Sequence, residues 1–275
     1  MTTLELVSPR LSEGRFMSVC ALTDESLFDQ IGVRVAFTQR GGGVSQGGYG
    51  SLNLGSHVDD DPAKVRENRR LVRVAFGVEE APCVVPNQIH GDTVLTVSDA
   101  ESVSYVQQDA DQGADGVIVA VPRIASLLCF ADCMPVIIVS PTGHFAVVHA
   151  GWRGVENEIA AKAVRLLADL DAAILGDRAA RSFNVYLGPY IHAECFETSS
   201  EVHHRFTDKF GGRCALDSRH IDLGQAQRVS LCAAGIDGDR IADAGVCTVC
   251  ENDLYFSYRA QNGRCGRHGA FAVLF

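Results

Sequence analysis

The sequence predicts a mixed α+β fold, or α/β with a mixed sheet, in a single large domain. Short apolar runs rich in β-branched residues alternate with turns between residues 83 and 150, as strands of a buried sheet do. A helical pattern follows, because Val155, Ile159, Ala163, Leu166 and Leu170 recur at spacings of three or four residues. No linker interrupts the 275 residues, a length that suits one large domain.

Each element has its own local signal. We expect a loosely structured extension over residues 1–30 and one domain over residues 31–275. Alternation predicts a strand at 33–37, and a glycine-rich loop follows at 40–50. Asp61 and Pro62 begin a helix that Gly77 ends. Further strands are predicted at 93–97, 116–121, 125–130, 136–139, 145–148, 183–187 and 270–275, and further helices near 197–209 and 223–234.

Composition and charge exclude several classes of protein. A hydrophobic content of 47% with 21% charged residues rules out a disordered chain. A net charge of −10 argues against a nucleic-acid partner, which would need a basic face. The sequence contains no recognisable secretory signal and no apolar membrane span. We therefore expect a cytoplasmic protein with no membrane partner, whose ten cysteines are mostly reduced thiols.

Three segments place a metal-ligand type in a turn beside a predicted strand. They contain His90, Cys133 and His149, and these residue types are ligands that zinc prefers. Three protein ligands leave a fourth position open, which is typical of catalytic zinc sites. Because the spacing is long, the pattern alone leaves two interpretations, a shared metal site or three unrelated residues.

Cys133 allows three interpretations. It can be a zinc thiolate, a nucleophile with His149 as its base, or a buried thiol. The sequence does not separate ligand from nucleophile, because both use a thiolate next to an imidazole. Asp115 and Asp132 each follow an alanine in a turn, where they can orient the histidines or cap the turn.

Three arginines are candidates for holding an anion. Arg40 opens the glycine-rich loop, which lacks the Walker ending and is either a flexible turn or a lid. Arg153 follows Trp152, a core anchor or a wall for a planar base, between Gly151 and Gly154, which let the backbone turn sharply. Arg259 ends a Phe-Ser-Tyr-Arg run and either enters a cleft or forms surface salt bridges.

Three further cysteines lie near the C-terminus. Cys247 and Cys250 form a C-x-x-C, which can bind zinc or do redox chemistry. No second C-x-x-C accompanies it, so a structural role is favoured. The roles of Cys247, Cys250 and Cys265 stay open.

Read in order, several segments resemble the YfiH family, also called the multicopper polyphenol oxidase or laccase-domain family and the purine nucleoside phosphorylase YfiH family. The resemblance covers roughly residues 31–275, and His-Ala-Gly-Trp-Arg-Gly at 149–154 is its strongest piece. The other pieces are Phe-Thr-Gln-Arg-Gly-Gly at 37–42, Asn-Leu-Gly at 53–55, Glu-Asn-Arg at 67–69, Gln-Ile-His-Gly at 88–91, Ala-Asp-Gly at 114–116, Ala-Asp-Cys-Met-Pro at 131–135, Leu-Gly-Pro at 187–189 and Phe-Ser-Tyr-Arg at 256–259.

The resemblance implies a four-layer α/β/β/α sandwich, similar to a cysteine-hydrolase-like superfamily that includes a bacterial toxin deamidase. It implies zinc, with copper also reported, held by His90, Cys133 and His149. The implied partners are small-molecule nucleosides and phosphate, and we expect a monomer. The implied activities are phosphorolysis of adenosine, inosine, guanosine and methylthioadenosine, and deamination of adenosine. Because only one candidate metal cluster is evident in the sequence, we discount the multicopper oxidase label.

Three hypotheses follow. The first is a zinc-dependent purine nucleoside enzyme, in which zinc activates water for deamination and Asp132 moves the proton. In its phosphorolysis reaction, Arg40, Arg153 and Arg259 hold phosphate. The second is a thiol hydrolase that uses Cys133 and His149 on an amide, as in the peptidoglycan-precursor editing that some family members resemble. The third is a metal-bound binding protein without catalysis.

Overall fold

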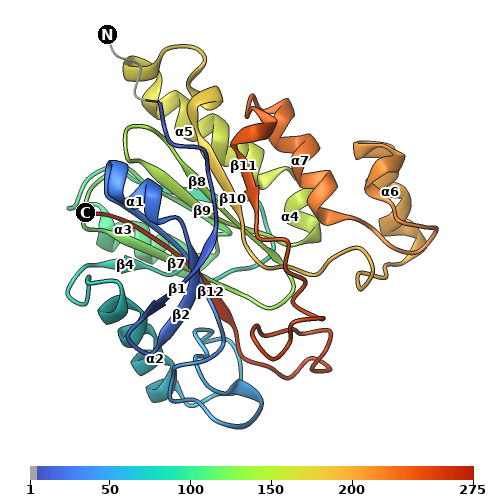
Figure 1. The fold of residues 1–275 in the computed structure, drawn as a ribbon, viewed down its shortest axis with the longest axis horizontal. Coiled ribbons are helices and arrows are strands. Elements are labelled where there is room, and N and C mark those ends of the chain that lie inside the picture. Colours follow the sequence, from blue (N-terminus) through green and yellow to red (C-terminus); the bar gives the residue numbers. More distant parts are fainter. Residues whose placement is uncertain (1–4) are drawn as a thin grey trace.

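Two six-stranded sheets form the centre of the computed structural model, which describes residues 5–275 (Figure 1). The first sheet has the order β1-β2-β3-β12-β7-β4 and the second β11-β10-β8-β9-β6-β5. The first contains β1 (Ser12–Phe16), β2 (Val19–Thr23), β3 (Val33–Thr38), β4 (Cys83–Val84), β7 (Ala125–Phe130) and β12 (His268–Leu274). The second contains β5 (Val94–Val97), β6 (Gly116–Val119), β8 (Met134–Val139), β9 (Phe145–Ala150), β10 (Asn184–Leu187) and β11 (Ile241–Asp243).

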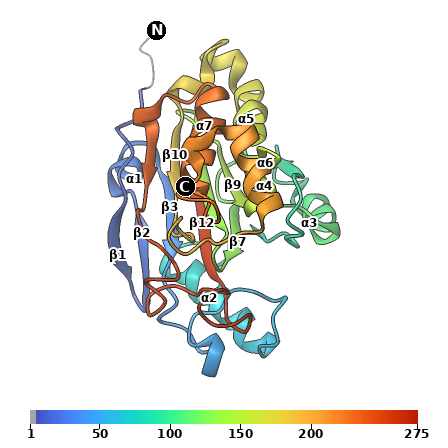
Figure 2. The same cartoon turned by 90° about the vertical axis from the view of Figure 1, so that its right-hand side faces the viewer.

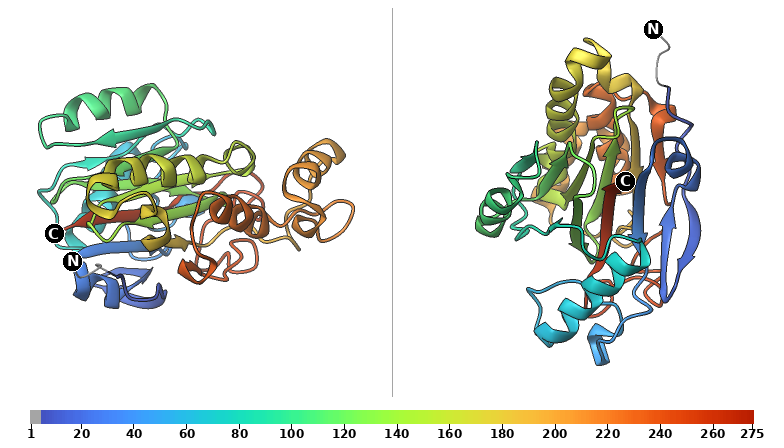
Figure 3. Two further views of the ribbon diagram at one scale, coloured as in Figure 1. Left: turned by 90° about the horizontal axis from the view of Figure 1, so that it is seen from above. Right: turned by 90° about the vertical axis from the view of Figure 1, so that its left-hand side faces the viewer.

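Seven α-helices accompany the sheets in the described part of the chain. They are α1 (Glu25–Ile31), α2 (Pro62–Ala75), α3 (Val103–Gln112), α4 (Trp152–Glu156), α5 (Ile159–Leu175), α6 (Ser200–Phe210) and α7 (Leu223–Ala233). Figure 2 shows α5 and α7 together on one side of the sheets. Figure 3 shows α3 and α6 at opposite ends of the molecule. No helix within residues 5–275 combines the length and the apolar character needed to cross a membrane.

Three apolar cores separate four layers. Phe37 of the first sheet and Phe145 of the second lie in the core between the sheets. Val72 of α2 packs against Phe271 on the outer side of the first sheet. Val164 of α5 packs in the core on the outer side of the second sheet. The α/β/β/α sandwich with mixed sheets is confirmed: β4–β7, β5–β6 and β10–β11 pair in parallel and the other pairs are antiparallel.

The central strands are apolar at nearly every position because both of their faces are covered. All residues of β7, β8 and β9 are buried. The last strand, β12, lies between β3 and β7, so segments from both ends of the chain are neighbours in one sheet (Figure 1). This pairing explains why residues 270–275 carry the apolar signal of a buried strand.

The expectation of a loosely structured lead-in is wrong for residues 12–31. They form β1, β2 and α1, and β2 pairs with β3. Asp24 caps α1 by accepting a hydrogen bond of 3.0 Å from the Leu27 amide, and Gly32 ends the helix at a φ of 71°. The strand β1 escapes sequence analysis because it lies at a sheet edge and its residues are mostly exposed.

The helical stripe predicted over residues 155–170 is also partly wrong. Val155 belongs to α4, and Glu158 at a φ of 57° separates α4 from α5. On α5 the side chains of Leu166 and Leu170 are exposed, whereas Asp171 is fully buried. The prediction is confirmed at Val155, Ile159 and Ala163, which are buried. It is wrong at Leu166 and Leu170, because the buried positions there are the next residues along the chain, Leu167 and Asp171.

The glycine-rich loop at 40–50 is anchored to helix α2 by one buried side chain. Asn68 of α2 accepts a hydrogen bond of 2.8 Å from the Val44 amide. Its amide group donates to the Ser45 hydroxyl and to the carbonyl oxygens of Ser51 and Asn53. The loop is thus held from one side by α2, which does not fit the expected flexible turn.

We expect Asn68→Ala to destabilise the protein by about 2 kcal/mol, because buried polar groups of the loop lose their partner. Urea unfolding monitored by circular dichroism measures the change. Arg66→Ala, at an exposed position of the same helix, is the matched control and should change stability by less than about 0.5 kcal/mol. Equal stability of the two variants would contradict the role given to Asn68.

Candidate metal centre and active site

Strand pairing brings together residues that are far apart in the sequence. In the β8–β9 pair Pro135 lies opposite His149, so Cys133 ends its turn beside that histidine. In the β6–β9 pair Gly116 lies opposite Val148, so Asp115 reaches the other side of His149. The loop that carries His90 precedes β5, which pairs with β6. The three predicted ligands therefore meet at one end of the second sheet.

The donor atoms of His90, Cys133 and His149 lie within 4.8 Å of one another. The Cys133 Sγ is 3.8 Å from the His90 Nε2, and the two imidazole rings meet edge to face at 4.8 Å. Donors on a tetrahedral zinc ion are separated by roughly 3.5 Å, so this set fits the metal with small side-chain movements. His149 is buried and His90 is exposed, which leaves an open side.

Asp115 organises the cluster. Its Oδ1 is 2.7 Å from His149 Nδ1, which leaves the His149 Nε2 free for a metal or for Cys133. The same carboxylate accepts hydrogen bonds from the backbone amides of His90 at 3.0 Å and Gly91 at 2.7 Å. His90 is held at a φ of 59°, so these bonds stabilise an unfavourable backbone conformation. Asp115 thus positions both histidines.

The electrostatics of the cluster favour a thiolate. Burial alone raises the pKa of the Cys133 thiol, but the charge and hydrogen bonding of His149 and His90 outweigh it and lower that pKa. Burial lowers the pKa of His149, yet the thiolate and Asp115 raise it overall. Burial raises the pKa of Asp115, but the hydrogen bonds from His149 and the loop amides outweigh burial, so that the pKa is lowered overall. Cys133 is therefore readily deprotonated, as both metal binding and nucleophilic attack require.

Gly151 provides space next to the cluster. A Cβ atom there would lie 3.0 Å from Cys133 Sγ and 3.2 Å from a carbon of the His90 ring. Its φ of −65° is accessible to any residue, so glycine is needed here for its lack of a side chain and not for its conformational freedom. Gly154 also avoids positive φ and lies buried inside α4. The expected sharp turn is present, because Gly151 alone connects β9, which ends at Ala150, to α4, which begins at Trp152. The missing side chain serves close packing there rather than a positive φ.

A cavity of about 410 Å³ opens over the cluster, a volume typical of small-molecule sites. Tyr258 and Phe196 supply aromatic surface, and Arg259 and Arg267 supply positive charge. The remaining lining residues are His57, Gln88, His90, Cys129, Ala131, Asp132, Cys133, His149 and Ile191. Among the residues that line it, Asp132 carries the one carboxylate.

Asp132 and Arg259 are linked at the cavity wall. Asp132 Oδ1 accepts a hydrogen bond of 2.7 Å from the Thr248 hydroxyl, and its Oδ2 accepts one of 2.7 Å from the Arg259 amide. The Arg259 guanidinium donates to the carbonyl oxygens of Cys195 and Glu197, both at 3.1 Å. Both residues line the cavity, and these bonds engage both carboxylate oxygens of Asp132.

The other two candidate arginines lie outside the cavity lining. Arg40 donates to the carbonyl oxygens of Gly50 and Asn252, and its guanidinium covers the Phe256 ring at 4.4 Å. Arg153 stacks over the Trp152 ring at 4.2 Å, and Trp152 packs against the outer core beside α5. The structure therefore joins Arg259 with the metal-type cluster and directs Arg40 and Arg153 to other contacts.

The cavity lining includes polar residues that were not predicted as binding groups, among them Arg267, Tyr258 and Gln88. Arg267 and Tyr258 lie in the segment around Arg259, so that segment held a signal, but Arg259 alone was chosen. Arg267 lies 5.8 Å from the Tyr258 ring. Gln88 exchanges two hydrogen bonds of 2.8 Å with the backbone of Cys129, which fixes the loop leading to His90.

The sandwich and its open three-donor site define an enzyme-like protein with a metal or thiol centre under a small-molecule cavity. A model of the multi-copper polyphenol oxidoreductase laccase family matches residues 34–275, nearly all of the chain. The chain belongs to this family. The YfiH resemblance is confirmed, because solved neighbours carry the names YfiH and YlmD.

Relatives carry two activity names. The chain is 32% identical over 252 residues to a purine nucleoside phosphorylase YlmD from Geobacillus stearothermophilus, covering 87% of this chain and 89% of that protein. It is 31% identical over 246 residues to an adenosine deaminase RL5 from an unknown prokaryotic organism, covering 86% and 92%. The crystal structure of YlmD from Geobacillus stearothermophilus aligns with a TM-score of 0.82 at 28% identity, covering 97% of this chain and 99% of that one.

Proposed function

We propose that the protein is a zinc-dependent purine nucleoside enzyme, acting as a monomer in the cytoplasm. Its reactions are phosphorolysis of adenosine, inosine, guanosine and methylthioadenosine, and deamination of adenosine. The observation that carries the proposal is the placement of His90, Cys133 and His149 at the base of a cavity that also presents arginine and aromatic side chains. The names of the relatives support the same two reactions.

Each part of the cavity has a task in this proposal. His90, Cys133 and His149 would hold zinc, with copper as the alternative metal, and the bound ion would supply Lewis acidity for the reaction. Tyr258 and Phe196 stack on the purine ring. Arg259 and Arg267 hold phosphate, whose negative charge they match. Asp132 either moves a proton or positions Arg259 through the bond to its amide.

The arrangement of Cys133, His149 and Asp115 supports a second candidate, a metal-free thiol hydrolase. His149 lies between the thiol and a carboxylate 2.7 Å from its Nδ1, which is the order of a nucleophile, a base and an orienting group. In this case Cys133 attacks the amide carbon while His149 takes the thiol proton and gives it to the departing amine, which leaves a thioester on Cys133. Water, deprotonated by His149, then cleaves the thioester, so that the acid is released and the thiol is restored. An amino-acid-linked peptidoglycan precursor is the corresponding substrate class.

Metal analysis combined with a product assay separates the two candidates. We expect His149→Ala to lose one equivalent of zinc per chain relative to the wild type, together with turnover of adenosine. Chromatography of wild-type reactions should show adenine only when phosphate is present, and inosine without it. A wild type that keeps turnover after complete removal of metal would overturn the zinc proposal and favour Cys133 as nucleophile.

A further inference from the structure

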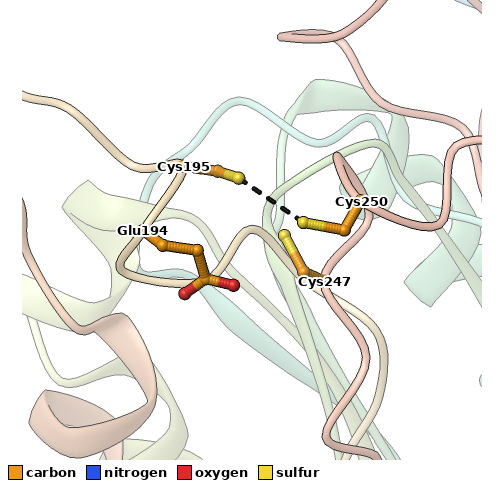
Figure 4. Close-up of side chains that lie close together, drawn as sticks. All are labelled: Glu194, Cys195, Cys247 and Cys250. Atoms are coloured by element: carbon orange, nitrogen blue, oxygen red, sulfur yellow. Dashed lines mark hydrogen bonds between the residues drawn. The ribbon is translucent and has the colours of Figure 1, made fainter.

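A second group of metal-ligand side chains lies outside the cavity. It comprises Glu194, Cys195, Cys247 and Cys250, whose donor atoms all lie within 4.8 Å of one another. Figure 4 shows the three sulfur atoms turned toward a common centre from two separate segments. The sequence-based expectation of a single candidate metal cluster is therefore wrong. Cys195, 52 positions before Cys247, supplies the partner that a second C-x-x-C would otherwise provide.

The sulfur spacing matches metal coordination. Cys195 Sγ and Cys250 Sγ are 3.7 Å apart. Two thiolates on a tetrahedral zinc ion, with bonds of about 2.3 Å, are separated by about 3.8 Å. A disulfide requires about 2.05 Å, and the described cysteines are all free. Three thiolates and one carboxylate supply four donors, the number that closes a structural zinc site.

The surrounding backbone prepares the cluster. The Glu251 amide donates to the Cys247 carbonyl at 2.9 Å, which closes the turn that brings Cys247 and Cys250 together. The His192 amide donates to Cys247 Sγ at 3.4 Å, a contact that stabilises a thiolate. Thr248 donates its amide to the Tyr190 carbonyl at 3.0 Å, which joins the two segments. A hollow of about 460 Å³ beside Cys247 and Cys250 gives an ion a path from solvent.

We propose that Cys195, Cys247 and Cys250, with Glu194 as fourth ligand, bind a structural zinc ion that is separate from the His90 centre. The ion at this site takes no chemical part in the reaction proposed above. The bonds from the ion to Cys195 and to Cys247 would join the loop after β10 to the loop after β11, two segments more than 50 residues apart in the sequence. Because all four positions are filled by protein, this ion binds no substrate.

The second site supports the wall of the cavity. The Cys195 carbonyl accepts a hydrogen bond from the Arg259 guanidinium. Thr248, between the two cysteines of the turn, donates to Asp132, the neighbour of Cys133. A metal that fixes Cys195 and the 247–250 turn therefore fixes the partners of Arg259 and Asp132. Loss of the metal should loosen both contacts and raise the KM for substrate.

Zinc stoichiometry of the full-length protein tests the proposal. We expect two equivalents in the wild type, and one in either His149→Ala or the double variant Cys195→Ser/Cys250→Ser. Combining all three substitutions should leave none. The zinc retained by His149→Ala reports the thiolate site alone, so failure of the nucleoside proposal leaves this result intact. Cys232→Ser, at an exposed cysteine of α7, is the matched control and should keep two equivalents.

Cobalt substitution gives a second readout. His149→Ala loaded with Co²⁺ should show the sulfur-to-metal absorption of a thiolate-rich tetrahedral site, and the single variant Cys250→Ser should weaken it. Three results would overturn the proposal. They are a His149→Ala protein without zinc, a Cys195→Ser/Cys250→Ser protein with wild-type zinc content, and a Cys195–Cys250 disulfide in freshly purified wild type.

Discussion

Asp115→Asn should weaken metal binding at the His90–Cys133–His149 centre by 10- to 100-fold, the range seen when groups that orient metal ligands are replaced. The substitution removes the charge that faces His149 Nδ1. It also replaces one carboxylate oxygen by an NH2 group, and the backbone amides of His90 and Gly91 donate to different oxygens, so one of these two amides faces a donor where it now has an acceptor. One change therefore weakens both the charge pairing of His149 and the hydrogen bonding of the loop that carries His90.

Chelator competition on the purified variant measures this affinity, with product formation followed at increasing zinc concentration. Because Asp115 acts by positioning the ligands, excess zinc should restore most of the turnover. Asp109→Asn, the same change at an exposed site of α3, is the control. An unchanged zinc affinity together with lost turnover would contradict this role and fit the thiol mechanism instead.

Asp171→Ala should give the largest loss of stability, about 3 kcal/mol. The carboxylate, on α5, is fully buried beside the turn that connects β8 and β9. Its Oδ1 is 2.7 Å from His144 Nδ1 in that turn. It also accepts hydrogen bonds from the hydroxyls of Ser140 and Thr142. Removing it leaves the buried Ser140 hydroxyl and the half-buried side chains of Thr142 and His144 without this partner. These residues lie in the β8–β9 turn, at the end of the strands opposite the active site.

The stability that Asp171 contributes should depend on pH. Burial raises the pKa of this carboxyl, but hydrogen bonds from His144, Ser140 and Thr142 outweigh burial and lower it overall. An aspartate whose pKa is lower in the folded state contributes stability above its unfolded pKa of about 3.9. That contribution is lost as the pH falls through the folded value. The difference between wild type and variant should thus be largest near neutral pH and shrink in acid.

Urea unfolding at a series of pH values measures both effects. Asp169→Ala, at an exposed position on the same helix, is the matched control and should follow the wild type throughout. A variant at Asp171 that unfolds at the same urea concentration as the Asp169 control would contradict the argument.

Local signals in the sequence determined much of the fold. Asp61 and Pro62 begin α2 as predicted, with Asp61 accepting a hydrogen bond of 2.8 Å from the Ala63 amide. The strands β7 to β9 were evident because strands covered on both faces are apolar at every position. Caps and buried strands act within a few neighbouring residues, so a single sequence contains them.

Elements without such a local signal are not predicted correctly from the sequence. The edge strand β1 is polar because much of it faces solvent. The helix α5 was assigned an apolar stripe that included Leu166 and Leu170, although Asp171 occupies the buried face. A charged residue can be buried only if other residues pair with it, and the partners of Asp171 are His144 and Ser140 in the turn between β8 and β9. Because that turn is remote from α5 in the sequence, the helical pattern alone does not predict the burial of Asp171.

The chemistry divides in the same way. The sequence by itself indicates His90, Cys133 and His149 as candidate ligands, by residue type and by the turns beside them, and leaves open whether they share one site. Only the tertiary structure decided that Asp115 orients them and that Arg267 lines the cavity while Arg40 and Arg153 do not. It alone joined Cys195 to Cys247 and Cys250. Strand register and loop packing set these distances, and both depend on contacts between residues that are remote in the chain.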